Sequence, residues 1–294
     1  MSFVQFLISG ISLGSVYALI ALGYTMVYGI VKMLNFAHGD VIMVGGFTTY
    51  TICSTMGLHP VIGVLLAVLV CTSLGVFIER IAYKPLRKAS SPLAVLITAI
   101  GVSYLLQNLA LLIFGADSKA FSSVISMEDV SLAEGQLIIT GETIVTIACC
   151  LVIMIGLTLF INKTKAGQAM LAVSEDKGAA QLMGINVNGT IALTFAIGSA
   201  LAAIAGILLC STYPSLTPYT GSMPGIKAFV AAVFGGIGSI PGALIGGILL
   251  GVIEILSKAY ISSQLSDAIV FAVLIIVLLV KPTGLLGKNI QEKV

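Results

Sequence analysis

Long apolar runs recur along this chain of 294 residues, and they restrict it to one class of protein. A helix of about 20 apolar residues crosses roughly 30 Å of hydrocarbon. Charged residues make up 9% of the chain, against about 25% in soluble proteins. Strand-period alternation is absent, which argues against a barrel. The sequence therefore predicts an all-α fold, a polytopic transmembrane helix bundle of about eight or nine membrane-spanning helices, in a single domain over residues 1–294.

One of the expected spans is ambiguous. The run 225–240 is short and flanked by Gly and Pro, so it is either a full crossing or a re-entrant half-helix. No basic residue precedes Lys32, so the first run is expected to be a retained helix rather than a cleaved signal peptide. The other expected spans cover residues 3–30, 41–56, 61–79, 93–114, 143–161, 190–211, a run that begins near 242, and 267–280.

The charge of the loops predicts the side of the membrane that each one faces. Basic residues gather at 80–88 and at 163–165, whereas acidic residues dominate 115–142, where Val, Ile and Thr runs also favour a short hairpin. By the positive-inside rule, residues 80–91, residues 163–189 and the C-terminus are expected in the cytoplasm. The protein is expected in the cell inner or plasma membrane, with segment 115–142 on its outer side.

The stretch 164–187 is the one long amphipathic segment in the second half of the chain, so it is expected in water. Ser174 is predicted to cap a helix of two to three turns whose first turn carries Glu175 and Asp176. Gly184 is predicted to end this helix as a left-handed residue.

This predicted helix has one small apolar face, formed by Ala179, Leu182 and Met183, while Lys177 and Gln181 point elsewhere. Two interpretations remain open. The face lies on the protein itself or on lipid headgroups, or it docks a soluble subunit.

Polar side chains near or inside the spans are candidates for a translocation path, because burying them in the membrane is costly. Asn35, His38 and Asp40 form either a structural knot between the first two helices or a lining of the inner pathway. Glu254 lies four residues before Lys258, so it either forms an ion pair within one helix or contacts a substrate ammonium group.

Glycine spacing predicts close helix contacts near the C-terminus. Gly242 pairs with Gly246, and Gly247 pairs with Gly251, at the four-residue separation that lets helix backbones approach in lipid. These pairs are predicted to pack helices together.

The residues exclude several other kinds of function. No P-loop and no HExxH zinc motif occurs, so ATP hydrolysis, if it drives this protein, takes place in another subunit. The five cysteines lie in apolar runs without a CxxC pattern, so no metal site and no cofactor is expected. A net charge of +2 is too small to indicate nucleic acid as a partner.

Four longer stretches carry a family resemblance. They are YALIALGYTMVYGIVKMLNFAHGD, TAIGVS at residues 98–103, GQAMLAVSEDKGAAQLMGINV and FGGIGSIPGALIGGILLGVIE. In this order, and over nearly the whole chain, they resemble the membrane permeases of branched-chain amino acid ABC importers of the LivH type. The resemblance implies a permease that moves leucine, isoleucine and valine across the membrane and is not itself an enzyme.

The resemblance also implies partners. In that family, two cytoplasmic ATP-binding subunits dock on two homologous permeases, and a periplasmic or lipid-anchored substrate-binding protein delivers the amino acid. Contact with the ATP-binding subunit is then expected at the cytoplasmic coupling loop, about 163–189. Its predicted contact residues are Ser174, Glu175, Asp176, Ala179, Ala180, Leu182, Met183 and Gly184.

The chain departs from the family pattern in this loop. Many relatives have Arg where it has Gln168 and Leu171. Related permeases also carry urea, short amides or other amino acids, so such substrates remain an alternative. The residues further leave open an ion-coupled secondary transporter and a membrane-embedded enzyme or scaffold.

Overall fold

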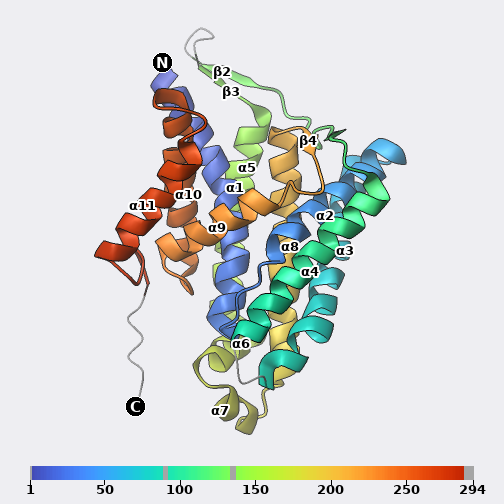
Figure 1. Cartoon of the computed structure of the whole chain (residues 1–294), viewed down its shortest axis with the longest axis vertical. Helices are drawn as coiled ribbons and strands as arrows, with labels where there is room; N and C mark the ends of the chain where they lie inside the picture. The colour runs from blue at the N-terminus through green and yellow to red at the C-terminus, as the bar shows by residue number, and fades with distance from the viewer. Residues whose placement is uncertain (1, 89–91, 133–136, 288–294) are drawn as a thin grey trace.

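The computed structural model describes residues 2–88, 92–132 and 137–287, and this part of the chain is mostly helical (Figure 1). Residues 89–91, Glu134, Lys288 and Lys293, which entered the predicted loop charges, lie outside the described residues. The α-helices are α1 (Ser2–Val31), α2 (His38–Tyr50), α3 (Pro60–Ile78), α4 (Pro92–Phe114), α5 (Gly141–Lys163), α6 (Lys165–Glu175), α7 (Lys177–Leu182), α8 (Val187–Thr212), α9 (Ser222–Gly235), α10 (Ile240–Tyr260) and α11 (Ser266–Val280).

Short irregular helices and strands complete the fold. α2 continues as the π-helical turn η1 (Thr51–Thr55), and α3 continues as the π-helical turn η2 (Glu79–Tyr83) before the 3₁₀ turn η3 (Pro85–Lys88). The strands form two antiparallel pairs: β1 (Lys119–Ala120) with β4 (Ser215–Leu216), and β2 (Val130–Leu132) with β3 (Leu137–Ile139). The β2–β3 pair is the hairpin expected in the acidic segment.

Six helices among the described residues are long and apolar enough to cross a membrane: α1, α3, α4, α5, α8 and α10. The other expected spans correspond to α2 with η1 and to the shorter apolar helices α9 and α11. With 14 residues, α9 is about 21 Å long at 1.5 Å per residue. α9 is thus shorter than the roughly 30 Å of a hydrocarbon core, which favours the re-entrant alternative for the run 225–240.

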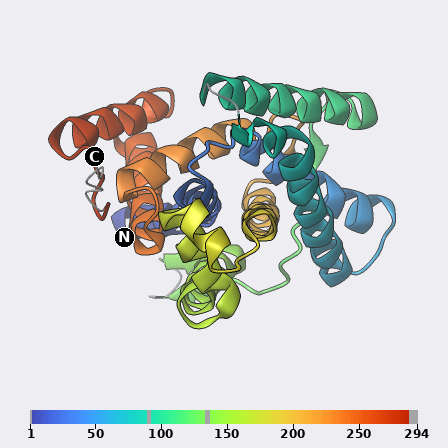
Figure 2. The same ribbon diagram turned by 90° about the horizontal axis from the view of Figure 1, so that it is seen from below.

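α1 and α8 form the centre of the bundle. Most of their residues are buried, whereas only a minority of the residues of α3, α4 and α5 are buried. The view from below shows the other helices around α1 and α8 (Figure 2). The exposed side chains of the outer helices are largely apolar, as lipid contact requires. A soluble protein would have a polar outer surface around an apolar interior. Here both the outer surface and the interior are apolar.

α1 packs most extensively against α10, and glycine makes this contact close. A Cβ added at Gly251 would collide with the backbone of Gly14, and one added at Gly247 would collide with Ala18. Small residues allow two helix backbones to approach in lipid, where no hydrophobic effect drives their association.

The other predicted glycine pair faces a different helix. A Cβ at Gly242 or at Gly246 would collide with the backbone of α9 near Gly235. The two pairs therefore lie on separate faces of α10, one against α1 and the other against α9.

Non-helical backbone precedes both α2 and α9, and the starts of these two helices meet. Lys32 adopts a left-handed conformation with φ of 60° after α1, and residues 32–37 contain no α-helix before α2 begins. Residues 213–221 precede α9 in the same way. Gly39 lies against Gly221 so closely that a Cβ at Gly221 would collide with the Gly39 carbonyl. This contact buries Gly39 and Gly221 themselves, whereas Lys32, Pro214 and Ser215 in the non-helical segments stay exposed.

The two basic loops lie together at one end of the molecule. Arg87 Nη1 donates a hydrogen bond of 2.8 Å to Asn188 Oδ1, which joins the loop after α3 to the start of α8. α6 and α7 lie at this end, and the β2–β3 hairpin lies at the opposite end (Figure 1).

The contact between α1 and α10 predicts the effect of adding one methyl group. Gly251→Ala should lower the unfolding free energy by about 1–3 kcal/mol, because the new Cβ meets backbone that has no space to move. The melting temperature of the purified protein in detergent measures this.

Gly156→Ala on α5 is the matched control. A Cβ at Gly156 meets open space, and alanine favours a helix over glycine by up to ~1 kcal/mol, so stability should be unchanged or higher. Equal melting temperatures for the two variants would contradict the proposed role of the glycine contact.

Candidate functional site

Polar side chains meet where α2 and α9 begin. Gln107 Nε2 of α4 donates a hydrogen bond of 2.8 Å to Asp40 Oδ1 in the first turn of α2. The same nitrogen lies 3.3 Å from Ser222 Oγ, at the first residue of α9, and 3.3 Å from Ser103 Oγ. A buried carboxylate is costly unless it is hydrogen-bonded. Gln107 therefore stabilises Asp40 and joins α4 to the starts of both short helices.

The predicted group of Asn35, His38 and Asp40 does not form one site. Asn35 Oδ1 accepts a hydrogen bond of 2.8 Å from the Tyr83 hydroxyl. The ring of His38 is buried against Tyr24, with ring centroids 4.6 Å apart. The three side chains contact three different parts of the bundle, so they form no common polar lining.

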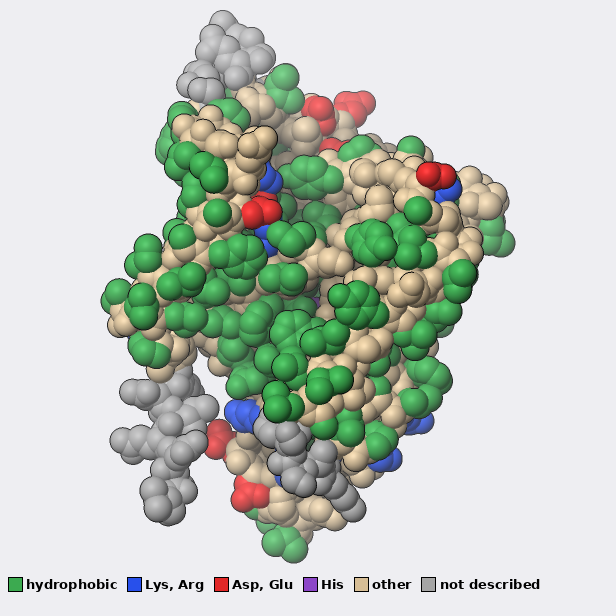
Figure 3. Space-filling view, viewed as in Figure 1, with side chains coloured by type: hydrophobic (Ala, Val, Ile, Leu, Met, Phe, Trp, Pro, Cys, Tyr) green, Lys and Arg blue, Asp and Glu red, His purple; other side chains and the backbone are tan. Residues whose placement is uncertain are grey.

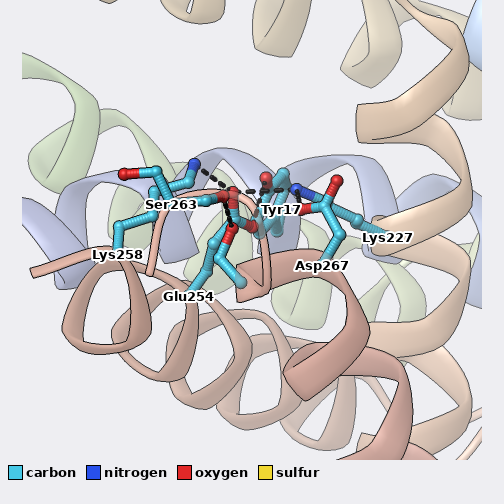
Figure 4. A network of polar contacts seen from close by, with 7 residues as sticks. Tyr17, Lys227, Glu254, Lys258, Ser263 and Asp267 are labelled. Atoms are coloured by element: carbon cyan, nitrogen blue, oxygen red, sulfur yellow. Dashed lines mark hydrogen bonds and ion pairs between the residues drawn. The ribbon is translucent and has the colours of Figure 1, made fainter. Parts of the chain in front are cut away.

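A second polar group surrounds Glu254 of α10 (Figure 4). The ion pair expected between Glu254 and Lys258 is present, with Lys258 Nζ 2.5 Å from Glu254 Oε1. The same oxygen lies 2.8 Å from Lys227 Nζ of α9, and Glu254 Oε2 accepts a hydrogen bond of 2.8 Å from the Tyr17 hydroxyl of α1. Three donors from three helices therefore satisfy this buried carboxylate.

Asp267 of α11 extends this group. Its Oδ1 lies 2.7 Å from Lys227 Nζ, so Lys227 bridges two carboxylates. The Lys227 side chain is 7% exposed, whereas Asp267 is 43% exposed and Lys258 is 37% exposed. Two lysines and two carboxylates give the group no net charge. We name Tyr17, Lys227, Glu254, Lys258 and Asp267 the charged network.

A cavity of about 310 Å³ opens beside the charged network. On the face shown in Figure 3, acidic and basic side chains gather in one place amid apolar surface near α10 and α11. The cavity wall combines polar and apolar side chains from α1, α8, α9, α10 and the connection after α8. They are Leu13, Tyr17, Leu209, Tyr213, Ser215, Thr220, Pro224, Glu254 and Lys258.

Sequence reasoning missed Lys227, Gln107 and Tyr17. Lys227 is the only charged residue of α9, and Gln107 lies beside Asn108 in an otherwise apolar part of α4. A strongly polar side chain within an apolar run was the available signal, because such a residue needs a partner. Tyr17 gave no such signal, since tyrosine is also an ordinary apolar core residue.

The amphipathic segment differs from its prediction in its helix boundaries. Ser174 does not cap a helix: it lies inside α6, and its hydroxyl donates to the Leu171 carbonyl at 2.6 Å. The cap is Asp176, whose Oδ1 accepts from the amides of Gly178 at 2.7 Å and Ala179 at 2.9 Å. Asp176 is favoured because its carboxylate reaches two free amides and complements the helix dipole. Glu175 is consequently the last residue of α6 and not part of the first turn of α7.

The apolar residues of α7 divide into buried and exposed ones. Ala180 is buried, while Ala179 is exposed. Leu182 is 90% exposed, the highest value for a large apolar side chain among the described residues, and Met183 is 82% exposed. Gly184 follows with φ of 82°, the left-handed conformation expected there.

Lys177 ties α7 to the centre of the bundle. Its Nζ donates a hydrogen bond of 3.3 Å to the carbonyl of Val31, the last residue of α1. Partial burial lowers the pKa of the Lys177 ammonium, and the positive charges of Arg87 and Lys32 lower it further. The hydrogen bond therefore connects α7 to the end of α1 although nearby positive charges disfavour the ammonium.

No group of three or more His, Cys, Asp and Glu side chains among the described residues fits a metal ion. Residues 10–14 spell GISLG, which matches the GxSxG pattern of a nucleophile elbow, but that elbow is a strand-to-helix turn. Here the pattern lies inside the continuous helix α1.

Comparison with known proteins identifies the family. Residues 6–278 match the model of the branched-chain amino acid transport system permease component. The chain is 46% identical to the high-affinity branched-chain amino acid transport system permease LivH of Salmonella typhimurium and of Escherichia coli, covering 99% of this chain and 98% of each relative. It is 44% identical, with the same coverage, to the permease BraD of Pseudomonas aeruginosa. The chain belongs to this permease family.

In this permease the predicted residues therefore occupy separate regions. Asp40 lies at the crossing of α2 and α9, Glu254 lies in the charged network, and the predicted coupling residues lie on α6, α7 and the turn after α7. The glycine pairs of α10 lie between these regions and hold α1 and α9 against α10. The family match also agrees with the polytopic helical fold expected from the sequence.

Proposed function

We propose that this chain is the membrane-spanning permease subunit of an ABC importer that carries leucine, isoleucine and valine. The observation that carries this proposal is 46% identity, over 99% of the chain, to permeases named for high-affinity branched-chain amino acid transport. A substrate-binding protein delivers the amino acid, and a second homologous permease completes the pathway. The whole chain acts as one membrane domain with a cytoplasmic coupling loop at about 163–189.

Two cytoplasmic ATP-binding subunits supply the energy, and the permease itself is not an enzyme. The sequence supports this division, because it contains no P-loop. ATP must then be hydrolysed on a partner whose movement reaches the permease through a contact in water.

The basic loops are proposed to face the cytoplasm, and the β2–β3 hairpin is proposed to face outward. Loops that carry Lys and Arg remain preferentially on the cytoplasmic side. The hydrogen bond between Arg87 and Asn188 supports a common side for residues 80–91 and 163–189. The C-terminus is assigned to the same side from its basic residues.

α7 and the residues beside it are proposed to dock the ATP-binding subunit. Apolar side chains that face lipid need no explanation, but α7 lies beyond the ends of α5 and α8 (Figure 1). Leu182 and Met183 nevertheless expose nearly all of their side chains there. Exposed apolar anchors at a polar end of a protein are typical of an interface. The bonds from Asp176 and Lys177 hold α7 in place, so a push on α7 reaches α1 directly.

Reconstitution tests the proposed function. Together with the second permease, the ATP-binding subunits and the binding protein, the chain should support ATP-dependent leucine uptake into proteoliposomes. Purified alone, it should show neither ATPase activity nor uptake. Uptake driven by a proton or sodium gradient without any ATP-binding subunit would contradict the proposal and favour a secondary transporter.

Thiol labelling tests the orientation. In a variant without native cysteines, Ser131→Cys on β2 should react with a membrane-impermeant thiol reagent in intact cells, because its side chain is exposed on the proposed outer side. Gln181→Cys on α7 should react only after the cells are permeabilised. The reverse pattern would refute the proposed orientation.

Charge substitutions test the docking role of α7. Leu182→Glu or Ala179→Glu should weaken binding of the ATP-binding subunit by about 2 kcal/mol, roughly thirtyfold in affinity, because an apolar anchor is replaced by a charge that lacks a partner. The melting temperature of the permease should not change, since both side chains are exposed. Co-purification of the subunits and leucine uptake measure the effect.

Gln181→Glu is the control for these variants. Gln181 lies on the same short helix and is also exposed, but it is polar and its replacement should change binding by no more than about 0.5 kcal/mol. If all three variants retained the ATP-binding subunits equally, α7 would not be the docking element. The basic loop around Arg87 and Lys88 would then be the next candidate.

A further inference from the structure

We infer that the cavity beside the charged network binds a free amino acid during transport. In this arrangement the Lys258 ammonium binds the α-carboxylate and the Glu254 carboxylate binds the α-ammonium. The inference rests on the proposed function, because it assigns the substrate class of that function to residues of this chain.

The cavity has both an apolar wall and a pair of opposite charges, which an aliphatic amino acid requires. Its volume of about 310 Å³ falls at the lower end of the ~300–1,000 Å³ typical of small-molecule pockets. Leu13, Leu209 and Pro224 provide an apolar wall, and Lys258 and Glu254 provide opposite charges. A zwitterion with a branched aliphatic side chain matches this division.

Lys258 is free to exchange its partner. Among the described residues, its ammonium contacts one acceptor, Glu254 Oε1. Its side chain is 37% exposed, so it can turn from Glu254 toward a ligand carboxylate without leaving water entirely. The two remaining N–H groups of a lysine ammonium are then available as donors.

Glu254, in contrast, is fixed in place. Tyr17 donates to its Oε2, and the buried Lys227 holds its Oε1. Lys227 is itself held by Asp267. When Lys258 turns away, Glu254 keeps its position, and a ligand ammonium can replace the Lys258 ammonium at Oε1.

The charge balance selects for a zwitterion. The two lysines and two carboxylates of the network sum to zero, and a zwitterion leaves that sum unchanged. A ligand with a net charge would bring an unpaired charge into a largely buried site, which is strongly unfavourable. A carboxylic acid without an amine would leave Glu254 without a replacement donor, and an amine without a carboxylate would leave Lys258 without an acceptor.

The test uses the assembled transporter in nanodiscs without the binding protein, so that the specificity of the binding protein does not enter. Radiolabelled L-leucine is the probe, and 4-methylpentanoate and 3-methylbutylamine are competitors that lack the amine or the carboxylate. Unlabelled leucine should displace the probe, and neither competitor should do so at tenfold higher concentration, since each loses a charge-assisted contact worth about tenfold or more in affinity.

Lys258→Met should reduce leucine binding and leucine uptake by about tenfold or more for the same reason. Its melting temperature should stay close to that of the unmodified protein, because Tyr17 and Lys227 still hold Glu254. Lys258→Arg keeps the charge and should restore most of the uptake. Lys119→Met is the control, because Lys119 lies on β1 beside the cavity-lining strand β4 but does not line the cavity.

Each result decides between binding and a merely structural network. Unchanged leucine binding and uptake in Lys258→Met would overturn the inference, as would a loss of uptake that follows a lower melting temperature. Displacement of the probe by either competitor as efficiently as by leucine would also overturn it. Absence of ATP-dependent leucine uptake by the unmodified complex, with its binding protein present, would instead overturn the proposed function.

Discussion

The close contact between α1 and α10 is the interaction on which the rest of the structure depends. In lipid, apolar surface gains nothing from leaving its solvent, so helices associate through tight packing. Gly14 against Gly251 and Ala18 against Gly247 provide that packing. Because the second glycine pair of α10 packs against α9, α10 positions both the central helix α1 and the short helix α9. Tyr17, Lys227 and Glu254 can meet only because these three helices are held at this distance.

The interrupted segments follow from a second constraint, the need to satisfy backbone polar groups inside the membrane. Residues 32–37 and 213–221 contain no α-helix, and the end of the second segment meets the start of α2 at the buried pair Gly221 and Gly39. The crossing at Gly39 and Gly221 leaves no room for side chains. Gln107 joins the two helix starts by bonding to Asp40 and approaching Ser222. The polar side chain of Gln107 therefore links α4 to the starts of α2 and α9 by hydrogen bonds.

α1 connects the two regions assigned to function. Tyr17 contacts the charged network, and Val31 accepts the bond from Lys177 of α7. These residues are fourteen positions apart on a continuous helix, which corresponds to about 21 Å. A displacement of α7 by an ATP-binding partner would thus reach the cavity through a rigid element. The proposed docking helix and the proposed amino acid site are therefore connected through α1.

The sequence by itself determined the fold class, the family, most of the membrane spans and the Glu254–Lys258 pair, because apolar run length, loop charge and i,i+4 spacing are local properties. It also indicated that Gly184 ends α7. Only the structure decided that Asp176 and not Ser174 caps α7, since α6 continues through Ser174 and ends at Glu175. It likewise separated Asn35, His38 and Asp40 and brought Lys227 to Glu254, across 27 positions of sequence. Partners of buried polar groups depend on which helices are adjacent, and packing between distant segments sets that adjacency.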